Sequence, residues 1–215
     1  MFFIDNNQKF IMKDFRAISR TMYGKVKSSI GIKTEYGKTF KENDPKYFSK
    51  IFDTNPKIHS DLINFINSND DIKNILEIGC GTGNFAAKFP KILEGKYYTG
   101  LDISENNIKL CKETHKHNFI CADFLKMELE KNYDLIFTEA VVDHVYDINL
   151  FIEKIVKTTK KYAYIHSYRG FFPELEKHEM DWRDDEGVYY NNLSVKQIKN
   201  TLIKCGLNES EFKIR

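Results

Sequence analysis

Three glycines at alternate positions, Gly79, Gly81 and Gly83, follow an apolar run that ends in Glu77 and Ile78. Such glycines let a strand turn sharply, bring bare backbone close to a ligand and start a helix whose first N–H groups face that ligand. A dinucleotide fingerprint has its third glycine one position later, where this chain has Asn84. The spacing predicts a nucleotide-binding turn that is not arranged for a pyrophosphate. A glycine-rich connection in some other α/β protein is the alternative.

Two carboxylates follow the next two apolar runs. Asp102 closes residues 97–102, nineteen residues after Gly83, where a βαβ unit places the tip of its next strand. A carboxylate at that tip can accept hydrogen bonds from both hydroxyls of a ribose. The alternative is that Asp102 belongs to the cap of the next helix, since Ser104 is a good N-cap residue. Asp123 lies near the end of a third predicted strand, residues 118–124, and its alternative is an ordinary surface-loop aspartate.

A fourth apolar run, residues 133–139, leads into an acidic residue followed by His144 and Val145. In this order and at these intervals, the four motifs over residues 74 to about 165 resemble class I S-adenosylmethionine-dependent methyltransferases. The resemblance implies S-adenosyl-L-methionine as cofactor, with Asp123 accepting a hydrogen bond from the adenine amino group and Phe124 against the ring. It implies a cofactor site made of Glu77, Gly79, Cys80, Gly81, Gly83, Asp102, Ile103, Asp123, Phe124 and Glu139.

Histidines supply the candidate catalytic groups. Methyl transfer requires a base only where the acceptor must lose a proton, and the unperturbed pKa of histidine suits that step at neutral pH. His144 is the first candidate because it follows the fourth strand, near the expected methyl group. The alternative is that His144 packs or orients a loop. His166, at the end of the fifth predicted strand, is a second candidate, and His178 is a weaker one.

Missing motifs narrow the class of acceptor. The fourth strand ends in Thr-Glu-Ala-Val, so the D-P-P-Y or N-P-P-Y clamp for exocyclic base amines is absent, and no Pro-Cys nucleophile for cytosine carbon is present. We therefore expect a methyltransferase that acts on an oxygen or nitrogen of a small molecule. One alternative is an RNA or protein methyltransferase that docks through basic N-terminal helices, because residues 1–60 hold twelve basic and six acidic side chains. Another is a non-catalytic cofactor-binding module.

Composition argues against several other classes. The 33 basic and 31 acidic residues leave a net charge of only +2, which creates no strong field for a polyanion, so nucleic acid is not an expected partner. The four cysteines lack C-x-x-C spacing, which argues against a metal site and against disulfides. The sequence has no leader-like start and no apolar run near 18 residues, so we expect a cytoplasmic protein without a membrane partner.

The surrounding pattern predicts the elements that position these residues. The fold class is α/β, a doubly wound, mostly parallel Rossmann-like sheet with an N-terminal helical cap over residues 1–70 and a core over residues 71–215. The sheet has seven strands if residues 187–191 contribute one, and six otherwise. Residues 169–192 form an aromatic insertion, which at this length in a compact domain is usually functional.

Helix signals are clearest at three places. Asn55 and Pro56 begin a helix in the cap, Asp147 caps one that runs through Lys160, and residues 194–205 form the last. A shorter cap helix begins at residues 44–45. Aromatic residues of the cap and the insertion are candidates for the wall of the acceptor pocket, with ordinary packing as the alternative for each; they are Tyr23, Tyr36, Phe40, Tyr47, Phe48, Trp182 and Tyr189.

Overall fold

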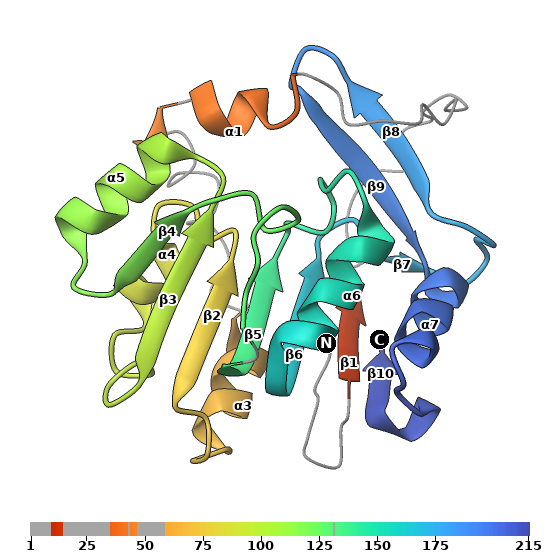
Figure 1. Ribbon diagram of the computed structural model, residues 1–215, viewed down its shortest axis with the longest axis horizontal. Helices are drawn as coiled ribbons and strands as arrows, with labels where there is room; N and C mark the ends of the chain where they lie inside the picture. The colour runs from red at the N-terminus through yellow and green to blue at the C-terminus, as the bar shows by residue number, and fades with distance from the viewer. Residues whose placement is uncertain (1–9, 15–34, 43, 47–58, 131) are drawn as a thin grey trace.

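The computed structural model describes residues 10–14, 35–42, 44–46, 59–130 and 132–215, and its centre is a parallel sheet (Figure 1). The sheet core has the order β4-β3-β2-β5-β6. These strands are β2 (Asn74–Ile78), β3 (Tyr97–Asp102), β4 (Asn118–Cys121), β5 (Tyr133–Glu139) and β6 (Thr159–Ser167). β1 (Phe10–Asp14) pairs in parallel with β6, and β10 (Phe212–Ile214) pairs in parallel with β1. The Rossmann-like α/β fold is as predicted.

Helices cover both faces of the sheet, which confirms the doubly wound arrangement. Strand alternation separates two cores, since Leu76 and Ile78 of β2 join one cluster while Ile75 joins the other. The first cluster packs beneath α6 (Ile148–Thr158) and α7 (Val195–Lys204). The second packs against α3 (Ser60–Asn67), α4 (Asn84–Lys88) and α5 (Glu105–Thr114).

Side-chain caps begin the main helices where the sequence predicts them. The Asp147 carboxylate accepts a hydrogen bond from the Leu150 N–H at 2.9 Å at the start of α6. Ser104 and Ser194 cap α5 and α7 in the same way through their hydroxyl oxygens. These caps satisfy N–H groups that have no partner inside the helix, so the short polar residues mark the helix starts.

The aromatic insertion forms a second, smaller sheet. Its strands are β7 (Phe171–Phe172), β8 (Glu179–Arg183) and β9 (Val188–Ser194), in the order β7-β9-β8. Of the two alternatives left open for residues 187–191, the structure excludes a strand of the main sheet, because β9 pairs antiparallel with β8, with Tyr190 opposite Asp181. A 3₁₀ turn, η2 (Glu209–Glu211), precedes β10.

The N-terminal cap differs in part from the helical prediction. Residues 10–14 form a strand, β1, that lies between β6 and β10. The predicted start of the second cap helix, at Asn55 and Pro56, lies outside the described residues; the helix α3 begins at Ser60 and buries Leu62 and Ile66 as expected. Most of the shorter predicted helix, with Tyr47 and Phe48, lies outside the described residues, as does Tyr23.

One short segment crosses above the carboxyl ends of the central strands (Figure 1). We call residues 35–42 the strap; it contains α1 (Lys38–Glu42). The strap is tied to the β8–β9 turn, where the N–H groups of Gly37 and Thr39 donate to the Gly187 and Glu186 carbonyls at 2.7 and 2.9 Å. At its other end, the Asn106 amide of α5 donates to the Lys41 carbonyl at 3.1 Å. The strap therefore joins α5 to the insertion.

Candidate functional site

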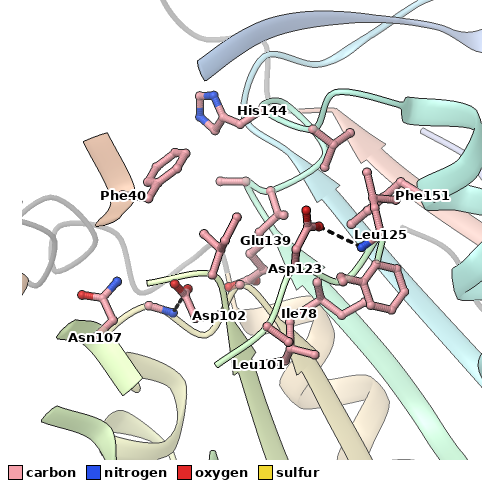
Figure 2. Close-up of a pocket in the computed structure, with 18 of the residues that line it drawn as sticks. Phe40, Ile78, Leu101, Asp102, Asn107, Asp123, Leu125, Glu139, His144 and Phe151 are labelled. Atoms are coloured by element: carbon pink, nitrogen blue, oxygen red, sulfur yellow. Dashed lines mark hydrogen bonds between the residues drawn. The ribbon is translucent and has the colours of Figure 1, made fainter. Parts of the chain in front are cut away.

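A pocket opens at the carboxyl ends of the central strands, where ligands bind in open α/β sheets (Figure 2). Its empty volume is about 800 Å³, which includes the open mouth and is large enough for a nucleoside with an attached side chain. The predicted site residues that line it are Gly79, Gly81, Asp102, Ile103, Asp123, Phe124, Glu139 and His144. The structure thus brings together residues from four separate sequence motifs.

The glycine turn presents backbone to this pocket. Gly79 and Gly81 both have positive φ values, 76° and 53°, which L side chains rarely adopt. A Cβ on Gly79 would lie 2.1 Å from the Val141 side chain. A Cβ on Gly81 would meet nothing within 4 Å, and Gly81 lines the pocket, so its bare backbone borders open space there.

Asp102 organises the turn and also faces the pocket. Its carboxylate accepts hydrogen bonds from the Gly81 and Ser104 N–H groups, both at 2.8 Å. Burial raises the pKa of Asp102, while these bonds and one from the Asn107 side chain oppose the rise. Asp102 therefore has a position compatible with both sequence interpretations, a helix-cap residue and a ligand-binding carboxylate. It braces the start of α5, and it lines the pocket beside Asn107 (Figure 2).

Asp123 also lines the pocket, two residues past the end of β4 and close to Leu125 (Figure 2). One carboxylate oxygen accepts from the Leu125 N–H at 3.0 Å, and the other accepts from the Tyr146 hydroxyl at 3.1 Å. Phe124, which is 5% exposed, packs edge-on against Phe151. A carboxylate beside apolar rings suits a flat heterocycle that donates hydrogen bonds from its edge.

Glu139, at the end of β5, lines the pocket and has a partner that the sequence did not suggest. The His59 Nδ1 atom lies 2.8 Å from a Glu139 carboxylate oxygen. His59 immediately precedes α3 and packs against the rings of Phe85 and Phe89. The N-terminal part of the chain therefore supports a wall of the pocket through this pair.

Four predicted site residues are not part of the pocket lining. Glu77 is buried and accepts a hydrogen bond from the Tyr98 hydroxyl, so its side chain braces β2 against β3. Cys80 is buried in the core below the turn. Gly83 lies against the side chains of Cys111 and His115. His166 is buried in β6, where strand alternation places it on the same face as Tyr164.

The strap contributes two of the aromatic residues predicted for an acceptor pocket, Tyr36 and Phe40, and both line the cavity. The Tyr36 ring packs edge-on against Tyr146 with centroids 4.7 Å apart. Burial, aided by the Asp123 charge, raises the pKa of Tyr36, so its phenol stays neutral. The Phe40 ring packs 5.3 Å from the ring of His144 (Figure 2).

His144 lies on the loop after β5, opposite Phe40 (Figure 2). Its Nδ1 atom is 2.8 Å from the Tyr189 carbonyl oxygen, and its Nε2 atom is 3.4 Å from the Tyr168 hydroxyl. Because a carbonyl oxygen only accepts, Nδ1 carries the hydrogen and Nε2 keeps its lone pair. Burial lowers the pKa of His144 to about 4, and the nearby Arg169 charge acts in the same direction. At neutral pH the ring is therefore uncharged and can accept a proton or hydrogen bond at Nε2.

His178, the weaker candidate, has a structural environment. The ring Nδ1 atom of His178 accepts a hydrogen bond from the Ser194 N–H at 3.1 Å. The backbone N–H of His178 donates to the Gln197 side-chain oxygen at 2.7 Å. Burial lowers the pKa of His178 to about 4. The residue fastens the start of β8 to the start of α7 and does not line the pocket.

Sequence reasoning missed several residues that shape this site. Asn107 had a detectable signal, because it lies three residues after Ser104 and so belongs to the first turn of α5, beside Asp102. Tyr146 and His59 had none, since their partners Asp123 and Glu139 are 23 and 80 residues away along the chain. Such pairs become visible only when the strands are assembled.

The described residues contain no group of three or more His, Cys, Asp or Glu side chains that could hold a metal ion. They also contain no helix with the length and apolar character needed to cross a bilayer.

Comparison with known families decides the identity of this site. The profile of a methyltransferase-domain family matches residues 69–203, a span that contains β2 to β6 and most of the pocket lining. The chain belongs to the class I S-adenosylmethionine-dependent methyltransferases. The cofactor of this family is S-adenosyl-L-methionine, and the pocket suits it because Gly81 leaves space for a ligand and two carboxylates face the same end.

Among curated relatives, the ubiquinone biosynthesis O-methyltransferase of Rickettsia prowazekii is 34% identical over 179 residues, covering 66% of this methyltransferase and 68% of the relative. The malonyl-[acyl-carrier protein] O-methyltransferase 2 of Ilyobacter polytropus is 41% identical over 80 residues, covering 35% and 31%. Against three malonyl-[acyl-carrier protein] O-methyltransferases, the chain spans less than half of the relative's length.

Solved structures support the fold. DesVI of Streptomyces venezuelae superposes with a TM-score of 0.56 over 78% of this chain and 92% of that one, at 14% identity. The 1,6-didemethyltoxoflavin-N1-methyltransferase of Burkholderia thailandensis, solved with S-adenosylhomocysteine, gives 0.55 over 84% and 82%, at 11% identity. At these identities the likeness concerns the fold alone.

Proposed function

We propose that this protein transfers a methyl group from S-adenosyl-L-methionine to an oxygen or nitrogen atom of a small-molecule acceptor. The observation that carries the proposal is that one pocket contains two carboxylates at one end and a neutral histidine between aromatic rings at the other. When bound, the cofactor's sulfonium supplies an electrophilic methyl group. The residues of the chain then have to bind and orient the cofactor and the acceptor, and to take up the proton that the acceptor loses.

In this proposal the carboxylates hold the nucleoside. Asp102 accepts hydrogen bonds from the ribose hydroxyls. Asp123 accepts a hydrogen bond from the adenine amino group, and Phe124 packs against the adenine ring. The backbone of Gly79 and Gly81 packs directly against the cofactor. Ile103 packs beside the ribose, and Glu139 faces the amino-acid portion of the cofactor. Glu77, Cys80 and Gly83 act from behind the turn, because they brace it and do not line the pocket.

His144 is the proposed catalytic base. Its Nδ1 hydrogen is held by the Tyr189 carbonyl, so Nε2 can take the proton that a hydroxyl or amine acceptor loses on methylation. A base of low pKa is weak, so its contribution includes orienting the acceptor through a hydrogen bond. We do not propose His166 as a catalytic residue, because it does not line the pocket.

The strap favours a small acceptor. Tyr36 and Phe40 enclose the pocket from above, which excludes water from the reacting atoms and leaves room for a compact molecule. The names of the O-methyltransferase relatives favour oxygen as the acceptor atom. The basic N-terminal segment that would dock RNA lies largely outside the described residues.

The test combines binding and turnover. Calorimetry should detect S-adenosylhomocysteine binding, and labelled S-adenosylmethionine should transfer its methyl group to a member of a panel of phenols, carboxylic acids, acyl thioesters and small amines. Absence of S-adenosylhomocysteine binding would overturn the cofactor site. If RNA is methylated instead, with affinity that falls steeply with salt, the small-molecule assignment is wrong.

A further inference from the structure

The loop that carries His144 is held by a strand of the other sheet. The Asn191 side-chain amide donates to the Val142 carbonyl at 2.9 Å and to the Val145 carbonyl at 2.8 Å. The Asn191 backbone N–H donates to the Asp143 carbonyl at 2.8 Å. One residue of β9 thus binds three carbonyl groups around His144, and Asn191 itself is 0% exposed.

The same strand also holds the imidazole. The Tyr189 carbonyl, two residues before Asn191 in β9, accepts from His144 Nδ1 at 2.8 Å. The extended strand sets the spacing of these two contacts. Tyr189 presents its carbonyl to the imidazole ring, and Asn191, two residues later, presents its side chain to the loop. A shift of the loop relative to β9 would lengthen the Nδ1 contact and release the ring.

A second set of contacts holds the loop and β9 together. The buried Asp143 carboxylate accepts hydrogen bonds from the Ser167 hydroxyl and from the N–H groups of Tyr168 and Arg169, the latter two at 3.3 Å. The Arg169 Nε atom donates to the Asn191 carbonyl at 3.2 Å. The end of β6, the loop and β9 therefore meet in one buried polar junction with Asn191 at its centre.

We propose that Asn191 is a positioning residue for methyl transfer, which fixes the main chain on both sides of His144 so that Nδ1 keeps its hydrogen on the Tyr189 carbonyl. Nε2, which the Tyr168 hydroxyl approaches at 3.4 Å, then keeps its lone pair available to the acceptor. This inference rests on the proposed function of His144. Asparagine suits the task because its planar amide offers two donors to two carbonyls three residues apart. Aspartate of the same shape offers none when ionised.

The primary test reads the His144 ring directly and requires no acceptor. Histidine labelled with ¹⁵N in the S-adenosylhomocysteine complex, assigned by comparison with His144→Gln, should show Nδ1 protonated and Nε2 unprotonated in the parent protein near neutral pH. Asn191→Ala should give a mixture of tautomers. Asn118→Ala is the control, because its amide donates to the Thr99 hydroxyl at the start of β4, at the opposite end of the strand from the pocket, and it should keep the parental spectrum.

Turnover separates positioning from a merely structural role. With the acceptor identified by the methylation panel, Asn191→Ala should lower kcat by about ten- to a hundredfold and leave S-adenosylhomocysteine affinity within about twofold of the parent, as expected for a misplaced catalytic group. Asn118→Ala should change neither. A folded Asn191→Ala protein with parental tautomer and parental kcat would overturn the proposal.

The parent spectrum keeps the proposal falsifiable even if Asn191→Ala does not fold. Nε2-protonated His144 in the parent protein contradicts it without any variant. Failure of the proposed function would look different. If His144 is not the base, His144→Gln keeps parental turnover, whichever tautomer His144 has in the parent protein. A parental tautomer that is lost in Asn191→Ala supports the positioning role independently of the acceptor.

Discussion

The two ends of the pocket are built in different ways. The cofactor end comes from segments that directly follow three neighbouring parallel strands, with Gly79 and Gly81 after β2, Asp102 at the tip of β3 and Asp123 after β4. The proposed acceptor end is assembled from the strap, the loop after β5 and a strand of the second sheet. One end therefore depends on local backbone geometry, and the other depends on contacts between segments far apart in sequence.

This difference has a consequence for how each end responds to change. A substitution in the glycine turn should act directly on a bound ligand, because backbone lines the pocket there. A substitution at the acceptor end acts through neighbours, since His144 is placed by β9 and Tyr36 is placed by Tyr146 and Tyr189. Variants of the two ends should therefore separate cofactor affinity from turnover.

The largest effect is expected at the cofactor end, from Gly81→Val. The branched side chain would occupy space that the ligand needs and would strain a residue with φ of 53°, so S-adenosylhomocysteine affinity should fall by about a hundredfold or more. Calorimetry measures the loss. Gly95→Val is the control, because Gly95 also has a positive φ and open surroundings but does not line the pocket. Parental affinity in a folded Gly81→Val protein would contradict this placement of the turn.

At the acceptor end, His144→Ala should lower kcat by about a hundredfold, within the range that general bases contribute, and leave S-adenosylhomocysteine affinity nearly unchanged. Steady-state kinetics at saturating acceptor, corrected for the folded fraction, gives the comparison. His178→Ala is the matched control, since burial lowers the pKa of both rings to about 4 and His178 does not line the pocket. If both variants lose only stability, His144 is a packing residue.

Asp102→Ala should weaken S-adenosylhomocysteine binding by about 1.5 to 3 kcal/mol, because a charge-assisted contact to the ribose and the brace on Gly81 are both lost. Asp134→Ala provides the comparison. Its buried carboxylate accepts from the Lys73 and Asn74 N–H groups at the opposite end of β2, so this variant should lose stability and keep affinity. Equal affinity for the ligand in the two variants would refute the ribose assignment.

Smaller effects are expected from the aromatic residues of the insertion. The Trp182 ring packs on Tyr189 with centroids 4.9 Å apart, and Tyr189 lies 6.4 Å from Tyr36. Trp182→Ala and Tyr189→Ala should each raise the acceptor's KM by about two- to tenfold, the value of one aromatic contact, without changing cofactor affinity. Parental KM in both variants would mean that the insertion only packs against the strap.

The smallest effect concerns pH. A base must be unprotonated to act, and the pKa of His144 is lowered to about 4, so protonation should reduce turnover only as the pH falls toward that value. Between pH 5 and pH 8, kcat should therefore change by less than about twofold on account of this group. An acid limb centred near pH 6.5, the ordinary histidine value, would show that the ring is not held in the environment described here.

Strand and helix predictions succeeded where the signal is local. The predicted strand bounds at residues 97–102 and 133–139 match β3 and β5, and the cap residues Asp147 and Ser194 begin α6 and α7. Alternation and capping depend on a few consecutive residues, so no tertiary information is required. The sequence left the sheet membership of residues 187–191 open, because their strand character is local but the choice between two sheets is not.

The sequence by itself determined the glycine turn, the carboxylate at the end of β3, the carboxylate just past the end of β4, and therefore the family of the cofactor site. Backbone freedom at Gly79 and Gly81 and the position of Asp102 follow from residue type and spacing alone. Only the tertiary structure decided that Glu77 and His166 are buried away from the pocket lining, that His59 pairs with Glu139, and that β9 holds His144. Hydrogen bonds across 45 to 80 residues of chain leave no periodic trace, because folding alone brings those atoms together.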